Sequence, residues 1–126
     1  MTVDSWQPTP TPQAISAEDL KRLLICASDF QTHKNFTPEF DWIQPFAQVD
    51  ASIWQNAVEN LNDEQLIEVI KLLTSLETSK NWDLAEKSPV IAVFKAYKKK
   101  SGVNRELVKW VKTHSDNQYL PFGPLL

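Results

Sequence analysis

Positive charge in this chain is concentrated in residues 80–112, which hold nine Lys or Arg and three Asp or Glu. Residues 1–79 hold four Lys or Arg and twelve Asp or Glu, although the whole chain has a net charge of only −3. Within the positive stretch, residues 89–112 have the pattern of a helix, a short turn at Gly102 and a second helix. Such a pair can place its second helix in the major groove of DNA, where cations contact phosphates. The cations expected on this basic hairpin are Lys98, Lys99, Lys100, Arg105, Lys109 and Lys112.

A helical hairpin with an ordinary solvated face explains the same cations without DNA. Glu106 interrupts the expected DNA-facing surface, and the isoelectric point of the chain is about 5.3. Lysines are also common at helix C-termini, where they interact favourably with the helix dipole. The basic hairpin could instead attract the acidic first half of the same chain or a second copy. Nucleic-acid binding is therefore the second hypothesis, behind binding to another protein or to itself.

Residues 113–116, with the sequence Thr-His-Ser-Asp, contain the side chains of a catalytic triad. Neighbouring residues cannot adopt the geometry of a triad, because that geometry brings groups together from distant segments. No catalytic residue is therefore assigned here. His114 is expected to be partly buried, with a backbone carbonyl near the helix end as its hydrogen-bond partner.

Asp29 and His33 are four residues apart, so a continuous helix would place both on one side. A third ligand from Glu39 or Asp41 could then complete a metal site. A pair with this spacing is common by chance, so these residues are only weak candidates and no metal is assigned. The single cysteine, Cys26, is interpreted as structural, because no electropositive helix start adjoins it.

Glycine occurs only at positions 102 and 123, which excludes the glycine-rich loops that bind phosphates and dinucleotides. The acidic pairs at residues 18–19 and 63–64 fall in first helical turns, where the helix dipole explains them. No cofactor is expected. A small enzyme with a pocket between helices remains a third hypothesis, because the polar groups of such a pocket converge only in three dimensions.

The apolar pattern predicts an all-α fold. The apolar side chains of residues 62–77 (NDEQLIEVIKLLTSLE) cover an arc of about 220° on a helix. One neighbour cannot bury so wide an arc, so helix 63–77 is predicted at the centre of an irregular bundle of about five main helices. The other main helices are expected at about residues 17–30, 51–60 and 89–101, and from 105 onward. Asp50, Ser88 and Asn104 are their predicted N-caps, and a short aromatic helix starting at Pro38 is expected to stop at Pro45.

The chain has the length of one domain. Residues 1–15, with Trp6 and the segment QPTPTPQ, are predicted to form a mobile arm, and residues 16–116 a single helical domain. Residues 117–126 form an apolar tail that is expected to pack on the bundle or on a partner. No segment has the length and composition of a membrane span, and one cysteine permits no internal disulfide, so a cytoplasmic protein is expected.

A resemblance is carried by four parts of the second half of the chain: Trp82, the sequence KSPVI at residues 87–91, Trp110, and DNQYLPFG at residues 116–123. In these parts the chain resembles a group of small, functionally uncharacterised helical proteins of bacteria. The resemblance spans Trp82 to Gly123 and covers about a third of the chain. It implies an all-helical bacterial protein of the cytosol and implies no chemistry.

These patterns favour a non-catalytic protein-interaction or regulatory module. The residues predicted to bind its partner are the cations of the basic hairpin together with Tyr119 and Phe122 of the tail.

Overall fold

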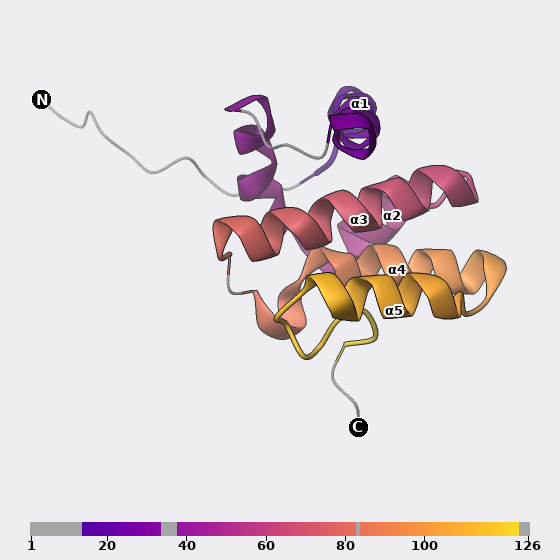
Figure 1. Cartoon of the computed structure of the whole chain (residues 1–126). Helices are drawn as coiled ribbons and strands as arrows, with labels where there is room; N and C mark the ends of the chain where they lie inside the picture. Colours follow the sequence, from indigo (N-terminus) through magenta and orange to yellow (C-terminus); the bar gives the residue numbers. More distant parts are fainter. Residues whose placement is uncertain (1–13, 34–37, 83, 124–126) are drawn as a thin grey trace, which may run out of the picture.

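The computed structural model describes residues 14–33, 38–82 and 84–123, and these residues are all-helical (Figure 1). The elements are α1 (Ala17–His33), η1 (Pro38–Gln48), α2 (Ala51–Val58), α3 (Asp63–Lys80), η2 (Ala85–Lys87), α4 (Pro89–Ser101) and α5 (Arg105–His114), where η marks a 3₁₀ helix. In Figure 1, α3 lies across the middle of the bundle, with α1 crossing it on one side and α4 and α5 on the other. The predicted irregular bundle around a central helix is therefore confirmed.

The core of the bundle is built on the apolar surface of α3. Six of its predicted core residues are at most 1% exposed: Leu66, Val69, Ile70, Leu72, Leu73 and Leu76. Because these side chains point to several sides of the helix, α1 packs on one flank of α3 while α4 and α5 pack on the other. Burial of each leucine or isoleucine contributes about 1.5–3 kcal/mol to folding. Neither α3 nor any other described helix is both long and apolar enough to cross a membrane.

The starts of α3 and α4 follow the capping chemistry of the sequence. Asn62 Oδ1 accepts a hydrogen bond from the Gln65 backbone at 2.8 Å, and Gln65 Oε1 accepts one from the Asn62 backbone at 3.0 Å. This reciprocal capping box holds the first turn of α3. At α4, the predicted cap Ser88 accepts a hydrogen bond from the backbone of Val90 at 3.1 Å, and Pro89 occupies the first helical position.

Three predicted helix ends and one predicted capping bond are wrong. The helix that begins at Pro38 continues through Pro45, because the fixed φ of proline suits a 3₁₀ helix. The side chain of Asp50 makes no capping bond to α2 and instead accepts a hydrogen bond from Ser52 Oγ at 3.2 Å. α1 and α3 each continue three residues beyond their predicted ends, to His33 and Lys80.

The described part of the C-terminal tail, residues 117–123, packs on the bundle. Leu120 belongs to the buried core, and Tyr119 and Phe122 are half-buried against it. At the other end of the chain, Ile15 also packs on the core. Residues 1–13 of the predicted arm, including Trp6, lie outside the described residues.

Candidate functional site

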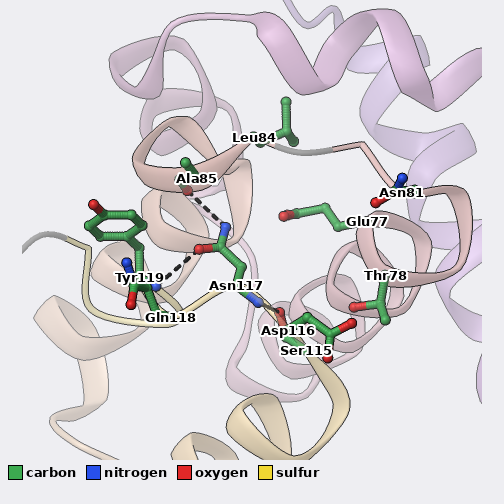
Figure 2. Close-up of a pocket in the computed structure, with 10 residues that line it drawn as sticks. All are labelled: Glu77, Thr78, Asn81, Leu84, Ala85, Ser115, Asp116, Asn117, Gln118 and Tyr119. Carbon is green, nitrogen blue, oxygen red and sulfur yellow. Dashed lines mark hydrogen bonds between the residues drawn. The ribbon is translucent and has the colours of Figure 1, made fainter.

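A polar pocket of about 310 Å³ opens where the end of α3 meets η2 and the segment after α5 (Figure 2). We call it the Glu77 pocket. Three stretches of the chain line it: Glu77, Thr78 and Asn81 at the end of α3; Leu84 and Ala85 before α4; and Ser115, Asp116, Asn117, Gln118 and Tyr119 after α5. Thr78 Oγ1 donates a hydrogen bond to the carbonyl of His114 at 3.0 Å, which joins α3 to the end of α5 beside the pocket.

Glu77 is the central polar group of this pocket. Glu77 is only 6% exposed, and Figure 2 shows its carboxyl group pointing from α3 into the space beside Asn117 and Ala85. Ser88 Oγ donates a hydrogen bond to Glu77 Oε2 while it accepts one from the backbone of Val90. Ser88 therefore connects the carboxyl of Glu77 to the N-terminus of α4, where the helix dipole favours negative charge.

Burial raises the pKa of Glu77 from its ordinary 4.5 to about 7, while the hydrogen bonds of Ser88 and Asn117 act in the opposite direction. Desolvation dominates because it penalises the charged form more than two polar contacts stabilise it. Near neutral pH the Glu77 pocket therefore holds a carboxyl group that exchanges readily between its neutral and anionic forms.

Asn117 holds the wall of the pocket opposite α3. Its Nδ2 donates a hydrogen bond to the carbonyl of Ala85 at 2.8 Å, and its Oδ1 accepts one from the backbone of Tyr119 at 3.0 Å. The Asn117 backbone in turn donates to Ser115 Oγ at 3.0 Å. Both ends of the Asn117 amide are thus engaged, so the segment after α5 is tied to the connection before α4 (Figure 2).

Ala85 adopts a left-handed backbone conformation, with φ of 51°. This region costs an L-residue roughly 1–2 kcal/mol, because Cβ approaches the following carbonyl oxygen. The Ala85 carbonyl nevertheless points to Asn117 and accepts its hydrogen bond. Strained backbone that is held in place by surrounding contacts is typical of functional sites, although it is not specific to them.

A second, wider hollow of about 860 Å³ lies between the start of α2, η2 and α4. Ser88 and Leu84 line this hollow, and Leu84 also lines the Glu77 pocket. Trp82 lines the hollow too and is half-buried against the core. Its indole Nε1 is buried and has no hydrogen-bond partner among the described residues.

The structure brings together three of the predicted partner-binding residues. Lys98 Nζ on α4 and Lys112 Nζ on α5 lie 5.8 Å and 6.0 Å from the centre of the Phe122 ring. Phe122 itself packs edge-on against the buried Phe94, with ring centres 5.3 Å apart. Arg105, Lys109 and Lys112 are exposed and follow one side of α5 at positions i, i+4 and i+7. We call Lys98, Arg105, Lys109, Lys112 and Phe122 the cationic aromatic surface.

The remaining predicted residues lie elsewhere. Lys100 Nζ donates a hydrogen bond to the carbonyl of Leu61 at 2.6 Å, so this cation is used inside the fold. Lys99 is exposed and lies about 100° around α4 from Lys98. Tyr119 lines the Glu77 pocket and not the cationic aromatic surface.

In the described residues, the basic hairpin does not contact the acidic first half of the chain through ion pairs. Within residues 14–33, 38–82 and 84–123, no ion pair joins this hairpin to an acidic side chain. The contacts found are Lys100 with the carbonyl of Leu61, and Ser101 Oγ with Asp63 Oδ1 at 2.7 Å. The single ion pair of the described residues joins Lys80 and Asp41, at 3.9 Å.

His114 is exposed, so its predicted partial burial is wrong. Its ring stacks on Trp110, with ring centres 4.0 Å apart. The predicted backbone partner is confirmed, because His114 Nδ1 lies 2.7 Å from the carbonyl oxygen of Trp110.

α1 continues through His33, so the metal candidates Asp29 and His33 share one helix. The side chains of His33 and of Glu39 lie outside the described part of the chain. Among the residues that are described, no three His, Cys, Asp or Glu side chains are grouped so as to hold a metal ion. Cys26 is buried in the core, as expected of a structural cysteine.

Sequence reasoning missed Glu77 as a site residue. A signal was present, because Glu77 continues the spacing of Leu66, Ile70 and Leu73 along one side of α3. An acidic residue in line with an apolar stripe marks either a helix end or a buried carboxyl. The hydrogen bond from Ser88 distinguishes a buried carboxyl from a helix end, but the sequence predicted only a capping role for Ser88.

Comparison of the chain with family models, with curated proteins and with solved structures gives no match. The function of the Glu77 pocket and of the cationic aromatic surface is therefore inferred from their own geometry and chemistry.

Proposed function

We propose that this protein is a non-catalytic binding module whose cationic aromatic surface docks on an acidic segment of a partner protein. The observation that carries the proposal is the placement of Lys98 and Lys112, from two different helices, around the half-buried ring of Phe122. Aromatic side chains are enriched in protein interfaces, and positive charge around such an anchor steers an acidic partner towards it. We place this module in the bacterial cytoplasm as part of the same proposal.

The chemistry of this surface suits a segment that carries both carboxylates and an apolar side chain. The carboxylates would pair with Lys98 and Lys112, while the apolar side chain would cover the exposed part of Phe122. The lysines are available for this role, because neither forms an ion pair with any described residue. Exposed ion pairs contribute about 0.2–1 kcal/mol each, so the interaction is expected to be of moderate affinity and sensitive to salt.

Nucleic-acid binding is the alternative that the same cations support. Arg105, Lys109 and Lys112 form an exposed stripe on α5, the second helix of the hairpin. Two features weigh against it. Glu106 is exposed on the same helix, and the net charge of the chain is −3.

Fluorescence anisotropy of the full chain tests the proposal. One probe is a labelled peptide of alternating glutamate and leucine, and the other is a labelled random DNA duplex. Lys112→Glu is expected to weaken peptide binding about tenfold, because it replaces an attraction with a repulsion. The matched control is Lys21→Glu, which reverses another exposed lysine, on α1, and is expected to leave the affinity unchanged.

Equal effects of the two substitutions would show that only net charge matters and would refute the cationic aromatic surface. Absence of peptide binding at low salt would refute it as well. Tight DNA binding that falls steeply with salt, without peptide binding, would assign the surface to nucleic acid.

A further inference from the structure

We infer that the Glu77 pocket binds a small organic cation, a primary alkylammonium or guanidinium compound, with the carboxylate of Glu77 as its counter-ion. This site is separate from the cationic aromatic surface and does not depend on the function proposed for that surface.

The first support is a buried acid without a basic partner. Glu77 is 6% exposed, yet no Lys, Arg or His of the described residues lies within ion-pairing distance of it. A buried charge that lacks a partner is costly, so an incoming cation gains more here than at an exposed carboxylate. The hydrogen bond from Ser88 already holds one carboxylate oxygen, so little further ordering is needed on binding.

The second support is the chemical character of the lining. Two acids line the pocket, Glu77 from α3 and Asp116 from the segment after α5, and none of its ten lining residues is Lys, Arg or His. The charged residues of η2, Glu86 and Lys87, line the second hollow instead. The only other titratable group in the lining is the phenol of Tyr119. An anionic ligand would therefore meet two carboxyl groups and no counter-charge.

The third support is the size and shape of the cavity. A volume of about 310 Å³ lies at the small end of the range for ligand pockets and suits an alkylammonium or alkylguanidinium group. Leu84 and Tyr119 belong to the lining and offer apolar surface for the alkyl part of such a ligand. The face of an aromatic ring also attracts a cation.

Isothermal titration calorimetry on the full chain tests this inference with four probes of similar size: butylammonium, butylguanidinium, butanol and butyrate. The two cations are expected to bind saturably, while the neutral alcohol and the anion are not. Glu77→Gln is expected to weaken cation binding at least tenfold, because it removes the charge and keeps the shape. Glu68→Gln, on the same helix but outside the pocket, is the matched control and is expected to bind like the unmodified protein.

The pH dependence gives a second measurement on the unmodified protein. A cation binds the ionised form of Glu77, so binding should tighten about tenfold between pH 6 and pH 8 and release a proton at pH 6. Equal binding of butanol and butylammonium would overturn the inference. So would absence of saturable cation binding, or equal loss of affinity in Glu77→Gln and Glu68→Gln.

Discussion

Replacement of Glu77 by Gln is expected to stabilise the free protein at alkaline pH and to change its stability little at acid pH. Gln keeps the size of the side chain and an oxygen that can accept the hydrogen bond of Ser88. The substitution replaces the ionisable carboxyl group with an amide that cannot ionise. The pH dependence of its effect on stability therefore isolates the cost of ionising Glu77 in the folded protein.

The magnitude follows from the pKa of Glu77. A rise from 4.5 to about 7 corresponds to about 3 kcal/mol of unfolding free energy. Because the folded state holds this proton more tightly than the unfolded state, the contribution of Glu77 to stability is complete below pH 4.5. It is lost as the pH rises through 7, the pKa in the folded state. Gln does not ionise, so the variant avoids this loss.

Urea unfolding followed by tryptophan fluorescence, at about pH 4.5 and at about pH 8.5, measures the effect. The advantage of Glu77→Gln over the unmodified protein is expected to grow by about 3 kcal/mol between the two pH values. Glu68→Gln serves again as the control, and its difference from the unmodified protein should stay nearly constant. A pH-independent difference for Glu77→Gln, or a variant less stable than the unmodified protein at pH 8.5, would refute the assigned cost of burying this carboxylate.

Two further substitutions test the local structure, both by urea unfolding. Gly102→Ala is expected to destabilise the protein by about 1–3 kcal/mol, because Gly102 has φ of 80° and ψ of −167°. A Cβ added at Gly102 meets no atom within 4 Å, so a loss of stability in this variant reports backbone strain alone. Unchanged stability would contradict the positive φ of Gly102. Leu120→Ala is expected to cost about 2–5 kcal/mol, because Leu120 anchors the tail in the core. The exposed neighbour Gln118 is the control, and an equal effect of Gln118→Ala would contradict this anchoring.

The fold was predictable because its signals are local. The wide apolar arc of α3 required neighbours on both flanks, and the side chains of Ser88 and Asn104 cap the helices that they were predicted to cap. Asp50 shows the limit of the same reasoning. An acid before a helix is a frequent cap, but its side chain binds Ser52 instead, and no sequence pattern distinguishes these two partners.

The Glu77 pocket was not predictable, because its parts come from distant positions. Ser88 and Asn117 follow Glu77 by 11 and 40 residues, and only the packing of α3, α4 and the tail brings them together. The cationic aromatic surface is an intermediate case. Its members were all named from the sequence, but the contact of Lys98 and Lys112 with Phe122 depends on where the tail lies.

The antiparallel helices α3 and α4 are fastened to each other at both ends. Glu77 binds Ser88 at one end, and at the other Lys100 and Ser101 bind Leu61 and Asp63. The connecting stretch is therefore not what keeps the pair together. If the chain were cut between these helices, we expect the two pieces to associate through these hydrogen bonds and their shared apolar surface. We therefore expect that two fragments separated between α3 and α4 would reassemble into the folded protein.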